Sequence, residues 1–121
     1  MEAKYKIGDT ACFACPMACG NICLVKEGPY SGTVIEGPEY ETACMFGSNL
    51  GMSNFACIVK ANALCDDLGI DTISTGNLIG VLIEGQELGL VSEEELGGMR
   101  LKWGDEETII QLIHHLSLIH I

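Results

Sequence analysis

Apolar residues recur at steps of three and four over residues 54–68, which is the spacing of one face of an α-helix. Ser53 is a suitable N-cap for this segment, and Gly69 fits the left-handed residue that often follows a helix. The pattern therefore predicts a helix from about Asn54 to Leu68. Its apolar stripe consists of Cys57, Ile58, Ala61, Leu64, Cys65 and Leu68.

The next helical pattern begins after Ser74 or Thr75, either of which is a suitable N-cap. Apolar residues continue over roughly Gly76 to Leu88, and Gly89 supplies a residue that can end the helix. The interior Gly80 and Gly85 lower the helix propensity of this segment, but they suit a helix whose backbone something approaches closely. We therefore predict a second helix over about 76–88.

Two later segments also carry signals for the start of a helix. Ser92 and Glu95 form a capping box, which predicts a short helix that Gly97–Gly98 ends. Asp105 precedes two glutamates that the helix dipole favours in a first turn, and it predicts a final helix. The buried face of that helix is expected to consist of Ile109, Ile110, Leu112, Ile113 and Leu116.

The first half of the chain is less regular. Residues 21–35 are broken by Gly28–Pro29 and end in β-branched residues, which predicts a loop or a short hairpin. Residues 36–54 form a long segment with many Gly and Ser residues, and such a segment is usually functional or partly helical. The predicted fold class is therefore mainly α: one multihelical domain with long functional loops.

Composition limits the possible functions. With 121 residues, 13.0 kDa and 48% hydrophobic residues, the chain can form one domain with a real core. The net charge of −11 excludes nucleic acid and an anionic membrane surface as partners, because both require a basic patch. The longest apolar run, Leu78 to Ile83, is far shorter than the ~20 residues of a membrane span.

Cysteines carry the strongest chemical signal. Seven of them follow an N-terminus that lacks an apolar signal-peptide core, so we expect reduced, partly metal-bound thiols in a cytoplasmic protein. Cys12, Cys15 and Cys19 stand at spacings of three and four, with Pro16 beside the second. This spacing is typical of iron–sulfur clusters and differs from the paired hooks of structural zinc sites.

Local spacing also predicts where these thiols lie. We expect Cys12 and Cys15 in an entering turn and Cys19 on the first turns of a helix, because proline suits a first turn. From spacing alone, Cys23 is a candidate fourth ligand of a [4Fe–4S] cluster. Cys44 is isolated, while Cys57 and Cys65 lie on the apolar helical stripe and are expected to be inert core thiols, as free cysteines often are.

Two groups of carboxylates have both a structural and a functional interpretation. Glu36, Glu39 and Glu41 follow one another around a Gly-Pro pair, where they form either a solvated turn or the source of a general base. Asp66 and Asp71 flank a turn between two predicted helices. They either cap those helices or accept hydrogen bonds from a heterocycle.

The ends of the sequence predict a fragment of a longer protein, and residues 114–121 are doubtful as native sequence. The cysteine motif begins only eleven residues into the chain, and the last segment stops without a helix cap or a polar tail. Its histidines lack partners at ligand spacing, so no role is assigned to His114, His115 or His120.

Taken in order, the motifs resemble those of the tungsten-containing aldehyde:ferredoxin oxidoreductases. The matching segments are Cys12-x-x-Cys15-Pro16-x-x-Cys19-Gly20, Glu36-Gly37-Pro38-Glu39-Tyr40-Glu41-Thr42, Gly47-Ser48-Asn49, and the segment from Asn62 to Asn77 that contains Cys65-Asp66-x-Leu68-Gly69-Ile70-Asp71. The resemblance covers roughly residues 8–113, which correspond to a middle slice of the C-terminal, helical part of a larger enzyme.

The resemblance implies a bis-pterin tungsten (or molybdenum) centre beside a [4Fe–4S] cluster. Such an enzyme oxidises an aldehyde and water to a carboxylate and passes the electrons to ferredoxin. Cys12, Cys15 and Cys19 match three cluster ligands. The family's fourth ligand lies downstream of this chain, so the resemblance overrides the assignment of Cys23.

The resemblance also assigns roles to the carboxylates. Asp66, Gly69, Ile70 and Asp71 match the motif that binds a pterin in this family. A glutamate of the acidic segment is the family's candidate for proton transfer. We favour Glu41 and keep Glu39 in reserve, and we expect the carboxylate to line a largely dry pocket that raises its pKa.

Two alternatives remain open at this point. A relative with the same motifs acts on another substrate, such as an aryl-CoA. A different class is a small acidic electron-transfer module, like a ferredoxin, with a cluster held by Cys12, Cys15, Cys19 and Cys23. The choice of substrate, of tungsten or molybdenum, and of a homo-oligomeric parent is also left open.

Overall fold

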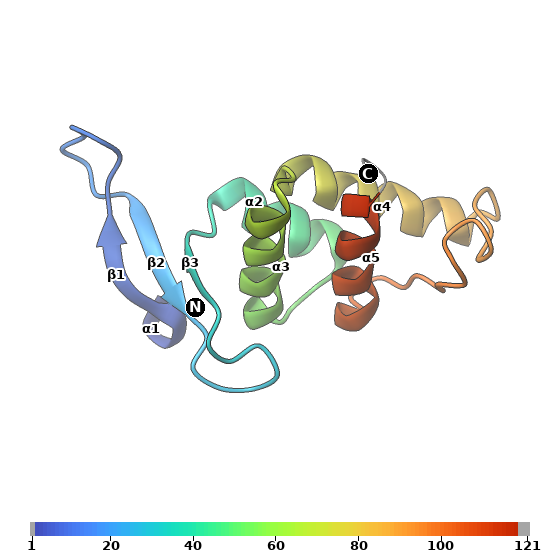
Figure 1. Ribbon diagram of the computed structural model, residues 1–121, viewed down its shortest axis with the longest axis horizontal. Coiled ribbons are helices and arrows are strands. Elements are labelled where there is room, and N and C mark those ends of the chain that lie inside the picture. The colour runs from blue at the N-terminus through green and yellow to red at the C-terminus, as the bar shows by residue number, and fades with distance from the viewer. Residues whose placement is uncertain (1, 119–121) are drawn as a thin grey trace.

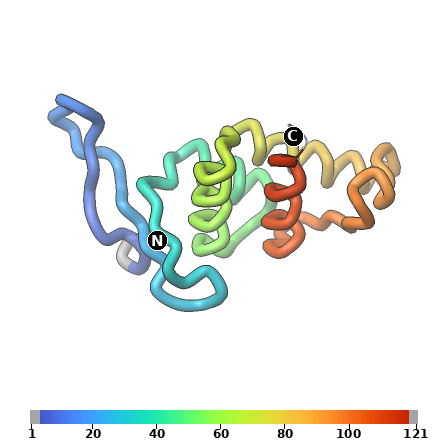
Figure 2. Tube along the Cα trace, viewed as in Figure 1, coloured from blue at the N-terminus to red at the C-terminus, as the bar shows by residue number. Residues whose placement is uncertain are grey.

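The computed structural model describes residues 2–118, which form a small sheet followed by packed helices (Figure 1). The chain runs from the sheet at one end of an elongated molecule, through the helices, to a loop at the other end and back (Figure 2). Of the predicted doubtful tail, residues 119–121, including His120, lie outside the described part. No helix among the described residues is long and apolar enough to cross a membrane.

The sheet contains three antiparallel strands in the order β1-β2-β3, after the short helix α1 at Glu2–Tyr5. The strands are β1 at Lys6–Thr10, β2 at Gly20–Leu24 and β3 at Val34–Glu36. The hairpin interpretation of residues 21–35 is therefore confirmed. Strand β1 was not predicted, because its five residues contain one apolar side chain and so carry no alternating pattern.

The helical part begins inside the predicted long loop. Helix α2 spans Tyr40–Phe46 and the 3₁₀ turn η1 spans Ser48–Leu50, so residues 36–54 are partly helical, as expected. The longer helices are α3 at Phe55–Leu68, α4 at Thr72–Glu87 and α5 at Glu106–Leu118. The prediction of a mainly α fold is therefore confirmed only for the part of the chain after the sheet.

The helices enclose the larger of two hydrophobic cores. Cys57 and Cys65 are both fully buried in it, as predicted for core thiols. The predicted face of α5 is also confirmed, with Ile109, Leu112 and Ile113 buried. The smaller core joins the sheet to α3 and consists of Cys23, Val25, Ile35, Ala56 and Val59.

One predicted helix starts earlier than expected, and another predicted helix does not form. Helix α4 begins at Thr72, four residues before the predicted start, because the Asp71 carboxylate accepts a hydrogen bond from the Ser74 backbone N–H at 2.8 Å and caps the helix. The Ser92–Glu95 capping box forms as predicted, but residues 93–98 make only turns. So short a segment forms too few hydrogen bonds to offset the free energy that helix nucleation requires.

The glycines of α4 allow α2 and the turn after it to pass close to this helix. A Cβ on Gly76 would lie 2.8 Å from the Met45 Cβ, which is too close for any side chain. A Cβ on Gly80 would lie 3.1 Å from the Asn49 Nδ2. The predicted close approach is thus confirmed for Gly80, and the tighter contact occurs at Gly76.

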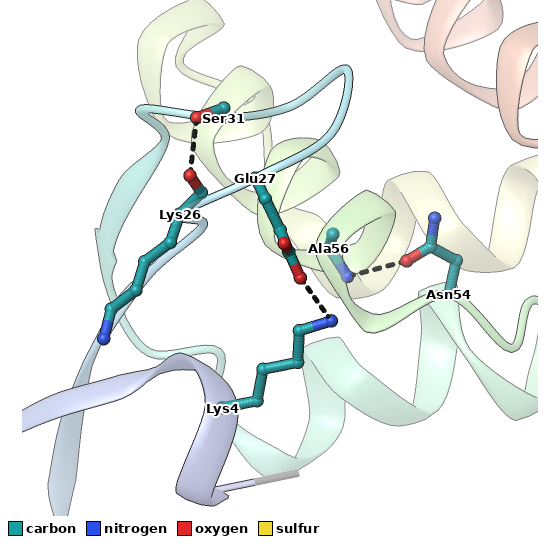
Figure 3. Close-up of polar contacts among 6 residues, drawn as sticks. All are labelled: Lys4, Lys26, Glu27, Ser31, Asn54 and Ala56. Carbon is teal, nitrogen blue, oxygen red and sulfur yellow. Dashed lines mark hydrogen bonds and ion pairs between the residues drawn. The ribbon is translucent and has the colours of Figure 1, made fainter.

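Polar contacts fix the beginning of the chain and of α3 (Figure 3). The Lys4 ammonium pairs with the Glu27 carboxylate at 2.9 Å, which joins α1 to the loop after β2. In that loop, the Ser31 hydroxyl donates to the Lys26 carbonyl at 3.0 Å. The Asn54 side chain accepts from the Ala56 backbone N–H at 3.1 Å and caps α3.

We expect Asn54→Ala to lower the free energy of unfolding by about 1–2 kcal/mol. The structure makes Asn54, rather than the predicted Ser53, the N-cap of α3. The Asn54 amide also donates to the Glu106 carboxylate at 3.1 Å and so ties α3 to α5. Urea denaturation measures this loss, and the neighbouring Ser53→Ala is the matched control with little expected effect. Equal losses in the two variants would contradict the assignment of the cap.

Candidate functional site

The three motif cysteines lie on the connection between β1 and β2, at the end of the molecule that is farthest from the helices (Figure 1). The Cys15 backbone N–H donates to the Cys12 carbonyl at 3.0 Å, so the predicted turn is confirmed. Cys19 is not on a helix, which corrects the prediction. It directly precedes β2, because Gly20 already pairs with Thr10 of β1 and draws the chain into the sheet.

All three thiols are exposed, and their chemistry is that of iron–sulfur ligands. Among the described residues, however, no three His, Cys, Asp or Glu side chains are close enough together to hold a metal ion. The Cys15 thiol instead contacts the Met17 carbonyl at 3.7 Å. The three thiols are therefore of the chemical type that binds iron–sulfur clusters, but they are not gathered around one point in the described chain.

Cys23 differs from these cysteines in both position and environment. It lies in β2, opposite Lys6 of β1 and Ile35 of β3, about 10 Å along the strand from Gly20. Its side chain is 5% exposed, and burial raises the pKa of the thiol. A buried thiol that resists ionisation is a poor metal ligand, so this environment favours the family pattern over a fourth ligand at Cys23.

Thiol reactivity tests this arrangement directly. Burial raises the pKa of Cys57 to about 11 and that of Cys65 to about 12, so neither thiol ionises near neutral pH. We expect iodoacetamide at pH 8 to alkylate Cys12, Cys15 and Cys19 rapidly and the two core thiols only after unfolding. Peptide mass spectrometry would measure each site. Rapid labelling of Cys65 in the folded chain would disprove its burial.

The acidic segment connects the sheet to α2. Gly37 is buried with φ at +124°, a backbone conformation that suits glycine, and its N–H donates to the Asn21 carbonyl at 2.6 Å. Glu39 is the N-cap residue of α2 without a side-chain cap bond, and Glu41 lies in the first turn. The hydroxyl groups of buried Thr42 and of Thr72 are hydrogen-bonded to each other at 2.8 Å.

The expected dry pocket around these glutamates is not present within the described chain. Glu39 and Glu41 are both exposed. A cavity of about 180 Å³ lies beside the segment, and Gly37, Pro38 and Cys23 line it, but neither glutamate does. The two carboxylates therefore point away from the core, and a dry wall facing them would have to come from other polypeptide.

The motif from Asp66 to Asp71 forms the turn between α3 and α4. Gly69 adopts the predicted left-handed conformation, and its N–H donates to the Asp66 carbonyl. The pKa of Asp71 is lowered because the Ser74 backbone N–H donates to its carboxylate. The capping interpretation is therefore confirmed for Gly69 and for Asp71.

The two aspartates of this motif face different hollows of the surface. Gly69, Ile70 and Asp71 line one of about 480 Å³, against Leu116 of α5. Asp66 lines another of about 510 Å³. The sequence analysis treated both carboxylates as parts of one turn, but the bend at Gly69 turns them to different sides.

Sequence analysis gave no role to Asn62, although the structure connects it to the motif. Its amide Nδ2 donates to the Asp66 Oδ2 at 2.7 Å. Asn62 is 6% exposed and lies on the buried side of α3. A polar residue on an apolar helical stripe, one turn before an aspartate, was the signal available in the sequence.

Exposed thiols on a hairpin connection, in a chain that also carries carboxylates at the ends of its helices, suit a redox metalloprotein. Residues 1–118 match the family model described as "Aldehyde ferredoxin oxidoreductase, domains 2 & 3". The chain therefore belongs to the aldehyde ferredoxin oxidoreductase family, which is a family of oxidoreductase enzymes.

Individual relatives agree with this assignment. The tungsten-containing aldehyde ferredoxin oxidoreductases of Pyrococcus furiosus and Thermococcus kodakarensis are each 41% identical to this chain over 118 residues. That alignment covers 97% of this chain and 19% of each relative. A P. furiosus protein named aliphatic sulfonate oxidoreductase, WOR-like subunit, is 38% identical over 84% of this chain and 16% of its own length. The chain thus spans about a fifth of the length of these relatives.

Proposed function

We propose that the chain is part of a tungsten enzyme that oxidises an aldehyde to a carboxylic acid and passes the electrons through a [4Fe–4S] cluster to ferredoxin. The observation that carries this proposal is the family match over residues 1–118, within which three motif cysteines lie exposed on one hairpin connection. The full-length enzyme then contains several times the length of this chain, as its relatives do.

In this proposal Cys12, Cys15 and Cys19 hold three irons of the cluster, and the fourth ligand comes from outside the chain. Their position on an exposed connection supports the role, because such a loop can close over a cluster without disturbing a core. The strongly acidic composition suits electron transfer, since redox partners often dock through charge.

Asp66 and Asp71 are the proposed pterin contacts, together with the Gly69 and Ile70 backbone between them. A tungsten (or molybdenum) bis-pterin, when bound, supplies the two-electron redox chemistry of the reaction. The Asp66 carboxylate is exposed and accepts one hydrogen bond from Asn62, so its other oxygen, Oδ1, can accept an N–H donor. Asp71 already caps α4 through Oδ2 and likewise offers Oδ1.

Glu41 is the proposed group that takes a proton as water adds to the aldehyde, and Glu39 is the reserve candidate. The Thr42–Thr72 hydroxyl pair anchors α2 to the start of α4, directly after the pterin motif. Glu41 is therefore carried on an element that is fixed relative to Asp71. Its exposure in this chain leaves its carboxylate free to face a pocket completed by the rest of the enzyme.

The test of this proposal is the cofactor content of the full-length enzyme and of its Asp66→Ala variant. We expect tungsten, pterin and iron in the wild type, with lower tungsten and pterin but unchanged iron in the variant. A buried hydrogen bond to a charged group contributes about 1.5–3 kcal/mol, so the loss is large. Equal loss of iron and tungsten would indicate misfolding, and normal occupancy of both would remove Asp66 from the pterin site.

A second candidate is an oxidoreductase of the same family with another substrate, such as an aryl-CoA or a sulfonate. The relative named for aliphatic sulfonates is nearly as similar to this chain as those named for aldehydes, which favours keeping this candidate. A comparison of aldehyde and sulfonate turnover by the full-length enzyme separates the two. The ferredoxin-like alternative is less well supported, because it requires the buried Cys23 as a ligand.

A further inference from the structure

We propose that Asn62 is a positioning residue, which fixes the Asp66 carboxylate for its ligand and joins it to the acidic segment. This inference rests on the proposed pterin contact at Asp66. It goes further by giving that contact a buried partner in α3, one turn before the motif. The argument depends on three observations: the burial of Asn62, its hydrogen bond to Asp66 and its position near Gly37.

The first two observations are the burial of the Asn62 amide and its hydrogen bond to Asp66. The Asn62 side chain is 6% exposed, between Ala61 and Leu64 of the larger core. A buried amide is costly unless it is hydrogen-bonded, and here Nδ2 donates to the Asp66 Oδ2 at 2.7 Å. Asp66 itself is exposed, so water could solvate it without this bond. A buried amide that donates its hydrogen bond to an exposed carboxylate suits a role in orienting that carboxylate.

The third observation links Asn62 to the other segments of the candidate site. A Cβ added to Gly37 would lie at van der Waals distance, 3.7 Å, from the Asn62 Oδ1, so the Gly37 backbone lies near the amide. The Gly37 N–H donates to the carbonyl of Asn21 in β2, two residues after Cys19. The Asn62 amide therefore lies between Asp66, to which it is hydrogen-bonded, and the start of the acidic segment.

The consequence is a fixed orientation of one carboxylate oxygen. With Oδ2 held by Asn62, the Oδ1 atom of Asp66 is the oxygen available to a ligand N–H donor. The same hollow is lined by Glu36 of β3 and by Lys60 and Asp67 of α3, so several charges act on this carboxylate. Without the amide, Asp66 would be free to rotate among these neighbours.

The experiment compares three variants of the full-length enzyme by the tungsten, pterin and iron retained after gel filtration. We expect Asn62→Ala to weaken retention of tungsten and pterin roughly tenfold while iron is unchanged. The control is Gln86→Ala. Gln86 bonds the Met99 carbonyl and the Leu101 N–H far along α4, so its loss destabilises the fold without touching Asp66.

The Asn62→Asp variant adds a second measurement, the pH dependence of tungsten retention, which general destabilisation of the fold would not change. At low pH its new carboxyl is protonated and can donate to Asp66, whereas at higher pH two carboxylates face each other and repel. Glu36, Asp67 and Lys60 are present in every variant, so they cancel in the comparison. We expect retention of tungsten by this variant to approach the wild-type level near pH 5 and to fall as pH rises, relative to wild type at each pH.

The outcomes separate the two proposals. A wild-type enzyme without tungsten and pterin would overturn the proposed function, and this inference with it. A loaded wild type with equal retention by Asn62→Ala would overturn only the role of Asn62. So would a loss matched by Gln86→Ala, or a pH profile of Asn62→Asp parallel to that of the wild type. Selective loss of tungsten and pterin, with recovery at low pH in Asn62→Asp, would support the positioning role.

Discussion

We expect each of Cys12→Ser, Cys15→Ser and Cys19→Ser to abolish assembly of the [4Fe–4S] cluster in the full-length enzyme. Cys23→Ser is expected to leave the cluster intact. The first three thiols are exposed on one hairpin connection, and the fourth is buried in β2. A serine hydroxyl at neutral pH does not replace a thiolate as a ligand of iron. Each of the three substitutions therefore removes one ligand of the cluster.

Iron and sulfide analysis after anaerobic reconstitution measures this result, together with the visible absorption of the cluster. Because a serine hydroxyl at a site that is 5% exposed can itself destabilise the sheet, Cys23→Ala serves as a second variant that preserves the apolar environment. A cluster that survives both changes at Cys23 but none at the other three positions supports the assignment. Loss of the cluster in Cys23→Ala, with the protein still folded, would make Cys23 a ligand.

Glu41→Gln is expected to lower turnover by roughly two to four orders of magnitude without changing metal content. Glutamine keeps the shape of the side chain but cannot take a proton, so the loss isolates proton transfer from binding. Glu41 lies in the first turn of α2, where the helix dipole favours a negative charge.

Steady-state kinetics and metal analysis of the same preparations measure the effect. Glu107→Gln is the matched control, because Glu107 is also exposed in the first turn of a helix but lies on α5, away from the motif. Full activity in Glu41→Gln together with a large loss in Glu39→Gln would transfer the role to Glu39. Equal losses in Glu41→Gln and Glu107→Gln would point to a general effect of charge.

Much of the fold could be predicted from the sequence where the signal is local. The apolar stripe of α3 and its ending at Gly69 depend on side chains within a few turns of one another. The ending is confirmed, and so is the stripe except for Leu68, which is exposed. The burial of Cys57 and Cys65 follows from the same stripe. The order and spacing of the motifs also identified the family, because a spacing along the chain is unaffected by how the chain folds.

Other features depend on partners that are distant in the sequence. The Asp71 cap that starts α4 is local, but the hydroxyl pair that ties Thr72 to Thr42 joins residues thirty positions apart. Cys19 is drawn away from a helix because its neighbour Gly20 pairs with Thr10 across the sheet. Propensity at one position is worth a fraction of a kcal/mol, so such long-range contacts override it.

The candidate site shows the same division. The sequence by itself determined which residues can do chemistry: three thiols, a run of glutamates, and two aspartates around a glycine. Only the tertiary structure decided that Asp66 and Asp71 line different hollows, and that buried Asn62 is hydrogen-bonded to Asp66 near Gly37. The physical reason is that residue type sets what a side chain can donate or accept, while the packing of β2, α2 and α3 sets which partner it meets.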